Sequence, residues 1–184
     1  MNRLFRILKL YREIRKRGNA VKVIIDGENL LHSLKTLNRE DVEIPEILTA
    51  LKRFLKNDEK IGAAYYFETF RKEDLQQQSL RKELKRNGVK VVFKPAKEII
   101  GGMRRKSRTD PAIIVEIMET GHQPDYGVVV LFSGDSDFED PLRAIKKRGR
   151  KAVVVSVEAH LSRELRTVAD AIIPLENLIA KSGY

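Results

Sequence analysis

The sequence predicts a three-layer α/β/α protein built on a mainly parallel, Rossmann-like sheet of about five to six strands. Two apolar runs rich in valine, at residues 21–25 and 128–132, are typical of strands that are buried on both faces. Segments with apolar residues at helical spacing separate these runs from further strand-like segments. Carboxylates follow both valine-rich runs, at the carboxyl ends of strands, where open α/β sheets keep their functional sites.

A basic amphipathic helix is predicted for residues 1–19, ahead of a single domain at residues 20–184. In this segment, apolar residues recur at helical spacing among Lys and Arg, and Gly18-Asn19 ends the pattern. Three placements remain open for the helix: on nucleic acid, on a membrane surface, or docked on the domain by its apolar stripe.

The first half of the domain alternates strands with amphipathic helices. Pro45 suits the first turn of a helix, and Asn87-Gly88 is a typical helix end. Strands are expected at residues 21–25, 61–67 and 89–93, and helices at residues 30–37, 45–57 and 72–87.

The second half begins with residues 94–108, which lack periodicity and contain Gly101-Gly102, so that a mobile loop is expected. Four basic side chains near the end of this loop are expected to contact phosphates: Arg104, Arg105, Lys106 and Arg108. Helices are then expected at 109–121, 138–149 and 161–168, strands at 128–132, 152–157 and 171–173, and a terminal apolar segment at 175–179. Right-handed crossovers would place the first strand at the centre of the sheet, beside the strand at 128–132.

The composition indicates a protein that binds a polyanion. Formal net charge is +10, from 36 basic and 26 acidic residues, although such a surface can also serve solubility alone. The absence of cysteine excludes disulfides and thiolate metal sites, and the three histidines, His32, His122 and His160, share no metal-ligand spacing. No apolar run is long enough for a membrane span and no signal peptide is recognisable, so we expect a cytoplasmic protein.

The candidate site consists of carboxylates that follow the two central strands. Asp26 ends the first strand, and Asp135 and Asp137 follow the strand at 128–132. In a doubly wound sheet these acids meet at the switch point. Grouped carboxylates without thiolates suit Mg²⁺ or Mn²⁺, which can drive phosphodiester hydrolysis without a nucleophilic side chain.

Some of the acids also have structural interpretations. Asp110 before Pro111 can be a helix N-cap, and Ser136 with Glu139 can form a capping box. Asp137 can stabilise a helix N-terminus through the macrodipole. Asp26 is harder to explain in this way, because a carboxylate at the end of a buried apolar strand has little structural reason to be there.

Two motifs carry a family resemblance. The strand leading into Asp26-Gly27-Glu28-Asn29, together with Ser133-Gly134-Asp135-Ser136-Asp137-Phe138, resembles the NYN domain family, the LabA-like branch of the PIN-like nucleases. The resemblance covers residues 21–178 and implies a PIN-like fold and Mg²⁺- or Mn²⁺-dependent cleavage of single-stranded or structured RNA.

The resemblance also assigns roles to individual residues. It implies that Asp26 is the first metal ligand, that Asn29 is its polar companion, and that Asp135 and Asp137 supply the acids after the fourth strand. The middle motif of the family, an acid at a helix start and another six residues on, falls here on Asp110 and Glu116, where Glu replaces the usual Asp. The expected catalytic set is Asp26, Asn29, Asp110, Asp135 and Asp137, and the expected metal ligands are Asp26, Asp110, Glu116, Asp135 and Asp137.

Two other functions stay open. A NYN-like fold can bind RNA or scaffold a partner without cutting, and a homodimer is compatible with the sequence. A phosphatase of the haloacid-dehalogenase type is the weaker alternative, suggested by Gly134-Asp135 with Asp140. That family needs a second Asp two residues after its nucleophilic Asp and then Thr, whereas Glu28 and Leu30 stand at those positions here.

Overall fold

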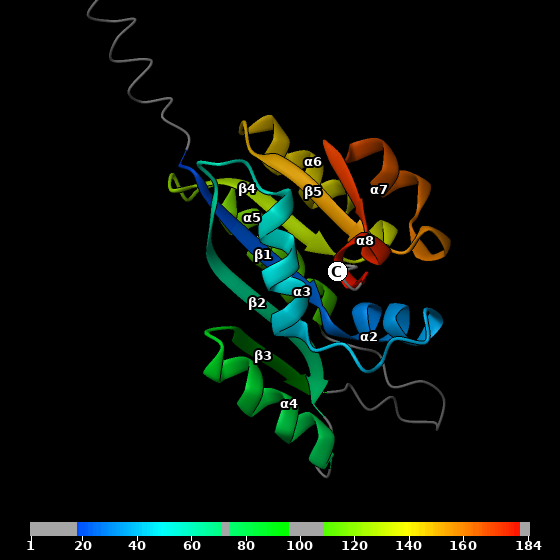
Figure 1. Cartoon of the computed structure of the whole chain (residues 1–184). Coiled ribbons are helices and arrows are strands. Elements are labelled where there is room, and N and C mark those ends of the chain that lie inside the picture. Colours follow the sequence, from blue (N-terminus) through cyan, green and yellow to red (C-terminus); the bar gives the residue numbers. More distant parts are fainter. Residues whose placement is uncertain (1–17, 71–73, 96–108, 181–184) are drawn as a thin grey trace, which may run out of the picture.

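A computed structural model describes residues 18–70, 74–95 and 109–180. The helix expected at 1–19 and most of the basic loop expected at 94–108 lie outside these residues. Six parallel strands form one sheet in the order β3-β2-β1-β4-β5-β6 (Figure 1). The strands are β1 Ala20–Asp26, β2 Lys60–Phe70, β3 Lys90–Pro95, β4 Tyr126–Phe132, β5 Lys151–Ser156 and β6 Ala171–Pro174. The predicted α/β class, the parallel sheet and the number of strands are confirmed.

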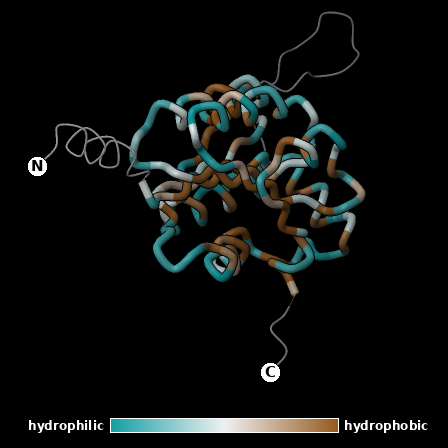
Figure 2. The backbone as a smooth tube through the Cα atoms, turned by 90° about the horizontal axis from the view of Figure 1, so that it is seen from above, coloured by the Kyte–Doolittle hydropathy of each residue, from teal (hydrophilic) through white to brown (hydrophobic). Residues whose placement is uncertain are grey.

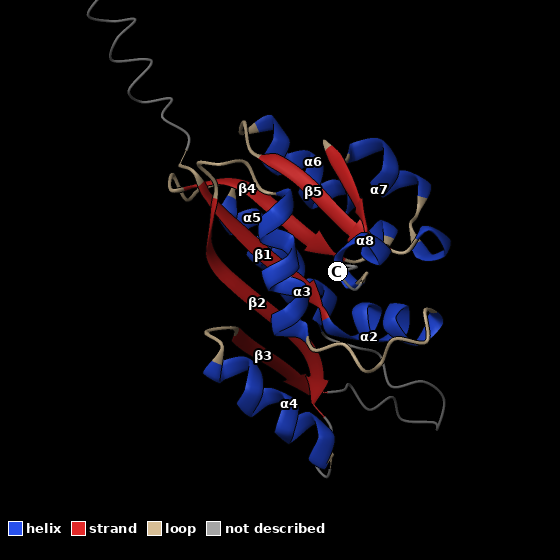
Figure 3. Ribbon diagram, in the orientation of Figure 1, coloured by secondary structure: helices blue, strands red, loops and turns tan. Residues whose placement is uncertain are grey.

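Helices cover both faces of this sheet (Figure 3). On one face, apolar side chains of α2, α3, α4 and α8 pack against β1, β2 and β4, and on the other face those of α5, α6 and α7 do so. The helices are α2 Gly27–Thr36, α3 Ile44–Leu51, α4 Leu75–Arg86, α5 Thr109–Thr120, α6 Glu139–Lys147, α7 Arg163–Val168 and α8 Leu175–Ile179. Figure 2 shows the result, with hydrophobic segments through the middle and hydrophilic segments around them.

The two central strands are the ones that the valine-rich runs predicted. In β1 and β4 every residue after the first is buried, as expected for strands covered on both faces. Their register pairs Ile25 with Phe132, so both strands end at the same edge of the sheet. From β1 the chain crosses to β2 on one side, whereas β4 lies on the other side. The expected switch point is therefore present, and the loops after β1 and β4 meet there.

Candidate metal-binding site at the carboxyl ends of β1 and β4

Asp26 is the buried centre of the candidate site. It is the last residue of β1 and the N-cap of α2, and its residue surface is only 7% exposed. Its Oδ1 accepts a hydrogen bond from the Asn29 backbone N–H at 3.2 Å, and its Oδ2 accepts one from the Ser133 hydroxyl at 3.0 Å. Both oxygens are thus held by protein donors, which fixes the carboxylate rigidly at the edge of the sheet.

The loop after β4 is tied to Asp26 through two side chains. Ser133 Oγ, which donates to Asp26, also accepts a hydrogen bond from the Asp135 backbone N–H at 3.2 Å. Asn29 Oδ1 accepts a hydrogen bond from the Gly134 N–H at 3.2 Å, so the first turn of α2 also binds this loop. A side chain at Gly134 would place its Cβ 2.1 Å from the His160 carbonyl oxygen, so only glycine fits there. Asn29 therefore contacts both Asp26, through its backbone N–H, and the loop after β4, through its side chain.

Asp110, Asp135 and Asp137 lie around Asp26 with different exposures. Asp110 stands in the first turn of α5 and is partly buried, whereas Asp135 and Asp137 are exposed. Asp135 caps the 3-10 helix Ser136–Phe138, because its Oδ1 accepts from the Asp137 N–H at 3.0 Å. Ser136 thus lies inside the 3-10 helix that Asp135 caps, and α6 begins after Phe138 without a side-chain cap.

The electrostatics show that these acids share one region. Burial raises the pKa of Asp26 to about 6, more than the hydrogen bonds from Asn29 and Ser133 lower it, and the negative charges of Asp110 and Glu28 raise it further. Burial likewise raises the pKa of Asp110; its bond from the Thr109 hydroxyl lowers it, and the charges of Asp135 and Asp137 add to the increase. Asp26 and Asp110 are thus harder to ionise because of burial and because other carboxylates are near them, and a cation at this edge would relieve that repulsion.

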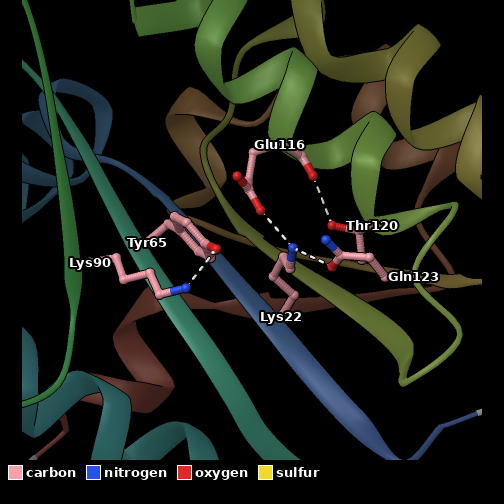
Figure 4. Close-up of polar contacts among 6 residues, drawn as sticks. All are labelled: Lys22, Tyr65, Lys90, Glu116, Thr120 and Gln123. Carbon is pink, nitrogen blue, oxygen red and sulfur yellow. Dashed lines mark hydrogen bonds and ion pairs between the residues drawn. The ribbon is translucent and has the colours of Figure 1, made fainter.

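Glu116 does not join this group. It lies on the second half of α5, and its Oε1 is 2.6 Å from Nζ of Lys22, which also donates to Gln123 Oε1 at 2.7 Å (Figure 4). Lys22 is 1% exposed and precedes Asp26 by four residues on β1, roughly 13 Å along the strand. The structure thus gives Glu116 a buried ion pair on the α5 face, far from the end of β1.

Sequence reasoning missed several residues around the site. Ser133 bridges the two motifs, but a serine after a strand is so common in turns that its sequence carries no clear signal. His160, which shares no metal-ligand spacing in the sequence, stacks on His32 at a centroid distance of 4.6 Å, and its Nδ1 lies 3.0 Å from Ser33 Oγ. Lys22 could have been noticed, because a lysine inside a run of buried apolar residues requires a buried partner.

The donor chemistry fits Mg²⁺ or Mn²⁺. These ions prefer oxygen ligands, and Mg²⁺ commonly uses one or two protein carboxylates while water and substrate phosphate complete its coordination. Asp26 and Asp135, linked through Ser133, can serve as such a pair. Within residues 18–70, 74–95 and 109–180, no three carboxylate or imidazole groups are close enough together to hold an ion by themselves. The site thus suits an ion whose coordination is shared with substrate.

The four basic residues expected to bind phosphates, Arg104, Arg105, Lys106 and Arg108, lie outside the described residues. The loop that contains them leads directly into α5, whose first turn carries Asp110. Their approach to the site therefore remains a prediction.

This strand order, with acids at the switch point, defines a Rossmann-like α/β protein with a carboxylate site. The model of the NYN domain family matches residues 20–176, and the chain belongs to that family. It is 27% identical over 167 residues to the low amplitude and bright protein LabA of Synechococcus elongatus, covering 88% of this chain and 87% of that protein. It is also 26% identical to an uncharacterized protein of Methanocaldococcus jannaschii, covering 91% of this chain but only 60% of that longer protein.

A solved structure supports the fold independently. The crystal structure of a protein of unknown function from Vibrio parahaemolyticus superposes with a TM-score of 0.71 at 21% identity, covering 86% of this chain and 94% of that one. Among the described helices of the present chain, none has the length and apolar character that a membrane crossing requires.

Proposed function

We propose that the protein is a ribonuclease that cleaves RNA phosphodiester bonds with Mg²⁺ or Mn²⁺ at the edge formed by β1 and β4. One observation carries the proposal: buried Asp26 is held through the Ser133 hydroxyl against the loop that presents Asp135. Membership of the NYN domain family supports it, because the motifs around these residues resemble those of PIN-like nucleases.

In this proposal Asp26 and Asp135 are the principal ion ligands, and Asp110 and Asp137 add negative charge beside them. A divalent ion held there would neutralise negative charge on the scissile phosphate and activate the attacking water. Ser133 and Asn29 position the two loops and do not react, because their side chains are engaged with Asp26 and the Gly134 N–H. Lys and Arg side chains, including those at 104–108, hold the RNA backbone.

The test is cleavage of labelled RNA by the purified full chain with Mn²⁺, Mg²⁺ or EDTA. Asp26→Asn and Asp135→Asn each remove one negative charge at nearly constant shape. Each variant should lower the cleavage rate to about one hundredth or less of the parent rate, while RNA binding in EDTA is retained.

Asp58→Asn is the matched control. Asp58 is an exposed turn residue just before β2, at the opposite edge of the sheet, so this variant loses the same charge and should cut RNA at the parent rate. If both site variants cut as fast as this control, the proposal is wrong.

A second function has a specific observation in its favour. The net charge of +10 suits a polyanion whether or not the acids hold an ion, so the chain can bind RNA or scaffold a partner without cutting it. Binding of RNA without cleavage under any of the metal conditions would support this alternative. A cytoplasmic location and a homodimer stay predictions under either function.

A further inference from the structure

A cavity of about 480 Å³ lies beside the candidate metal-binding site, on the side of the sheet edge that α2 covers. It is lined by the first turns of α2, the carboxyl end of β2 and the first turns of α4. Asp26 is in register with Phe67 of β2, and the next residue, Glu68, lines the cavity. A volume of this size suits a small organic group.

Glu68 gives the cavity a buried carboxylate that is incompletely paired. The residue is only 6% exposed, and within the described residues its buried Oε2 makes no hydrogen bond of ordinary length and angle. Burial raises the pKa of Glu68, and the nearby Gln77 side chain and Tyr66 hydroxyl lower it only in part. A carboxylate oxygen removed from water and left without a donor is costly, and such groups are rare away from functional sites. A ligand that brings N–H groups into the cavity would remove this cost.

The other lining residues restrict what that ligand is. Three of the described lining residues, Glu28, Glu68 and Asp74, are acidic, and none is basic. Asp74 already caps α4 by accepting from the Gln76 and Gln77 backbone N–H groups. Leu31 and Leu80 add apolar surface, and the described residues contain no trio of acids or imidazoles suited to a metal ion. These features favour a ligand with an apolar body and an edge of N–H donors.

An unpaired nucleobase has this combination, and single-stranded RNA offers its bases in this way. Guanine fits best, because its N1–H and N2 amino groups lie side by side and match the oxygens of one carboxylate. Adenine and cytosine offer one exocyclic amine on this edge, and uracil offers one ring N–H.

Resting on the proposed ribonuclease function, we infer that this cavity is a base-recognition subsite for an unpaired guanine of the RNA substrate. Glu68 accepts from the guanine N1–H and N2 amino groups, and Leu31 and Leu80 contact the ring. Because the cavity adjoins the end of β1, a guanine seated there brings a neighbouring phosphate towards Asp26. Glu68 is thus a specificity-determining residue.

The experiment uses short oligouridines that carry a single central G, A, C or U, with binding measured in EDTA and cleavage measured with Mn²⁺. The parent chain should bind the G-containing strand about tenfold more tightly than the other three, and should cut it near the G. Glu68→Gln replaces a carboxylate oxygen that accepts from guanine with an amide that donates. This variant should bring all four affinities within about threefold of one another while binding of the all-uridine strand stays unchanged.

Glu119→Gln, on the exposed end of α5, is the matched control and should keep the preference for G. Leu31→Trp is a second variant for the case in which Glu68→Gln does not fold. Leu31 is 39% exposed, so a larger side chain can be accommodated at the surface, and it should obstruct the cavity and remove the same preference.

The outcomes separate the two proposals. Preference for G that is lost in Glu68→Gln, without cleavage of any strand, supports the subsite and rejects the nuclease. Cleavage without preference among bases, or with a preference that both variants retain, rejects the subsite and leaves the nuclease standing. If no RNA binds, both are wrong.

Discussion

At the scale of single residues, the charge state of Asp26 is the property that most affects both folding and binding. Its pKa is raised from 3.8 to about 6 because burial removes water from the carboxylate. The folded protein therefore binds this proton more tightly than the unfolded chain does. The stability that results is fully present below about pH 4 and is lost as the pH rises to about 6, by up to about 3 kcal/mol.

Asp26→Asn should remove this pH dependence. Asn is also a good N-cap, so α2 should remain intact, and the free energy of unfolding at pH 7 in EDTA should rise by about 1 to 3 kcal/mol. Near pH 4 the variant and the parent should differ little. Thermal unfolding from pH 4 to pH 8 measures this, with Asp58→Asn as the control. Equal slopes for parent and Asp26→Asn would contradict the prediction.

The site could be predicted from the sequence where one residue carries the signal by itself. Asp26 was such a case, because an acid directly after a run of buried apolar residues is unusual. Asp135 could be placed near it from the strand order alone. The linking role of Ser133 could not, because it depends on a hydrogen bond between residues 107 positions apart. Glu68 directly follows the apolar strand expected at residues 61–67, so the same signal could have pointed to it.

At the scale of elements, the pair formed by Lys22 of β1 and Glu116 of α5 distinguishes a structural role from a metal-binding role. Glu116→Leu leaves a buried ammonium without its carboxylate, which should lower the free energy of unfolding by about 3 kcal/mol. Lys22→Met should cost a similar amount. The double variant should regain most of the loss, because both charges are gone and apolar side chains fill their places.

Cleavage assays on the folded fraction complete this test. Because Glu116 pairs with Lys22, all three variants should cut RNA at the parent rate once they are folded. If Glu116 is instead an ion ligand, Glu116→Leu and the double variant lose cleavage while Lys22→Met keeps it. Denaturant unfolding and cleavage with Mn²⁺ give the two measurements.

Element types were predictable, whereas several boundaries were not. Valine-rich strands and helices ended by glycine follow from local periodicity. Strand β2 continues to Phe70, past the expected end at residue 67, because Glu68 and Thr69 pair with Phe93 and Lys94 of β3. The helix expected at 45–57 is split into α3 and the 3-10 helix Lys52–Phe54. The extension of β2 depends on partners in β3 that lie more than twenty positions further along the chain, so local periodicity could not predict it.

At the scale of the whole molecule, the net charge of +10 predicts binding to RNA that depends strongly on salt. Replacing Arg104, Arg105, Lys106 and Arg108 by Gln should reduce the slope of log affinity against log salt by up to about 0.7 per lost contact. Titrations of single-stranded RNA at several salt concentrations measure the slope.

A control variant with the same charge loss isolates the position of these four residues. Lys52, Lys85, Arg86 and Lys147 are exposed and lie near the amino ends of the strands, away from the carboxylates. Their replacement by Gln should change the slope much less. If both sets of replacements reduce the slope equally, RNA binding depends on the overall charge of the protein, and residues 104–108 do not form a specific RNA-binding segment.

The link between Asp26 and Ser133 also has a consequence for the cell that makes this protein. The two residues are 107 positions apart, so a ribosome adding about 5–20 residues per second makes Ser133 roughly 5–20 s after Asp26. Throughout that interval the growing chain has Asp26 but neither the serine that holds it nor Asp135. Under the proposed ribonuclease function, a nascent chain would therefore be unable to cut the messenger RNA from which it is being translated until β4 has been made and has entered the sheet.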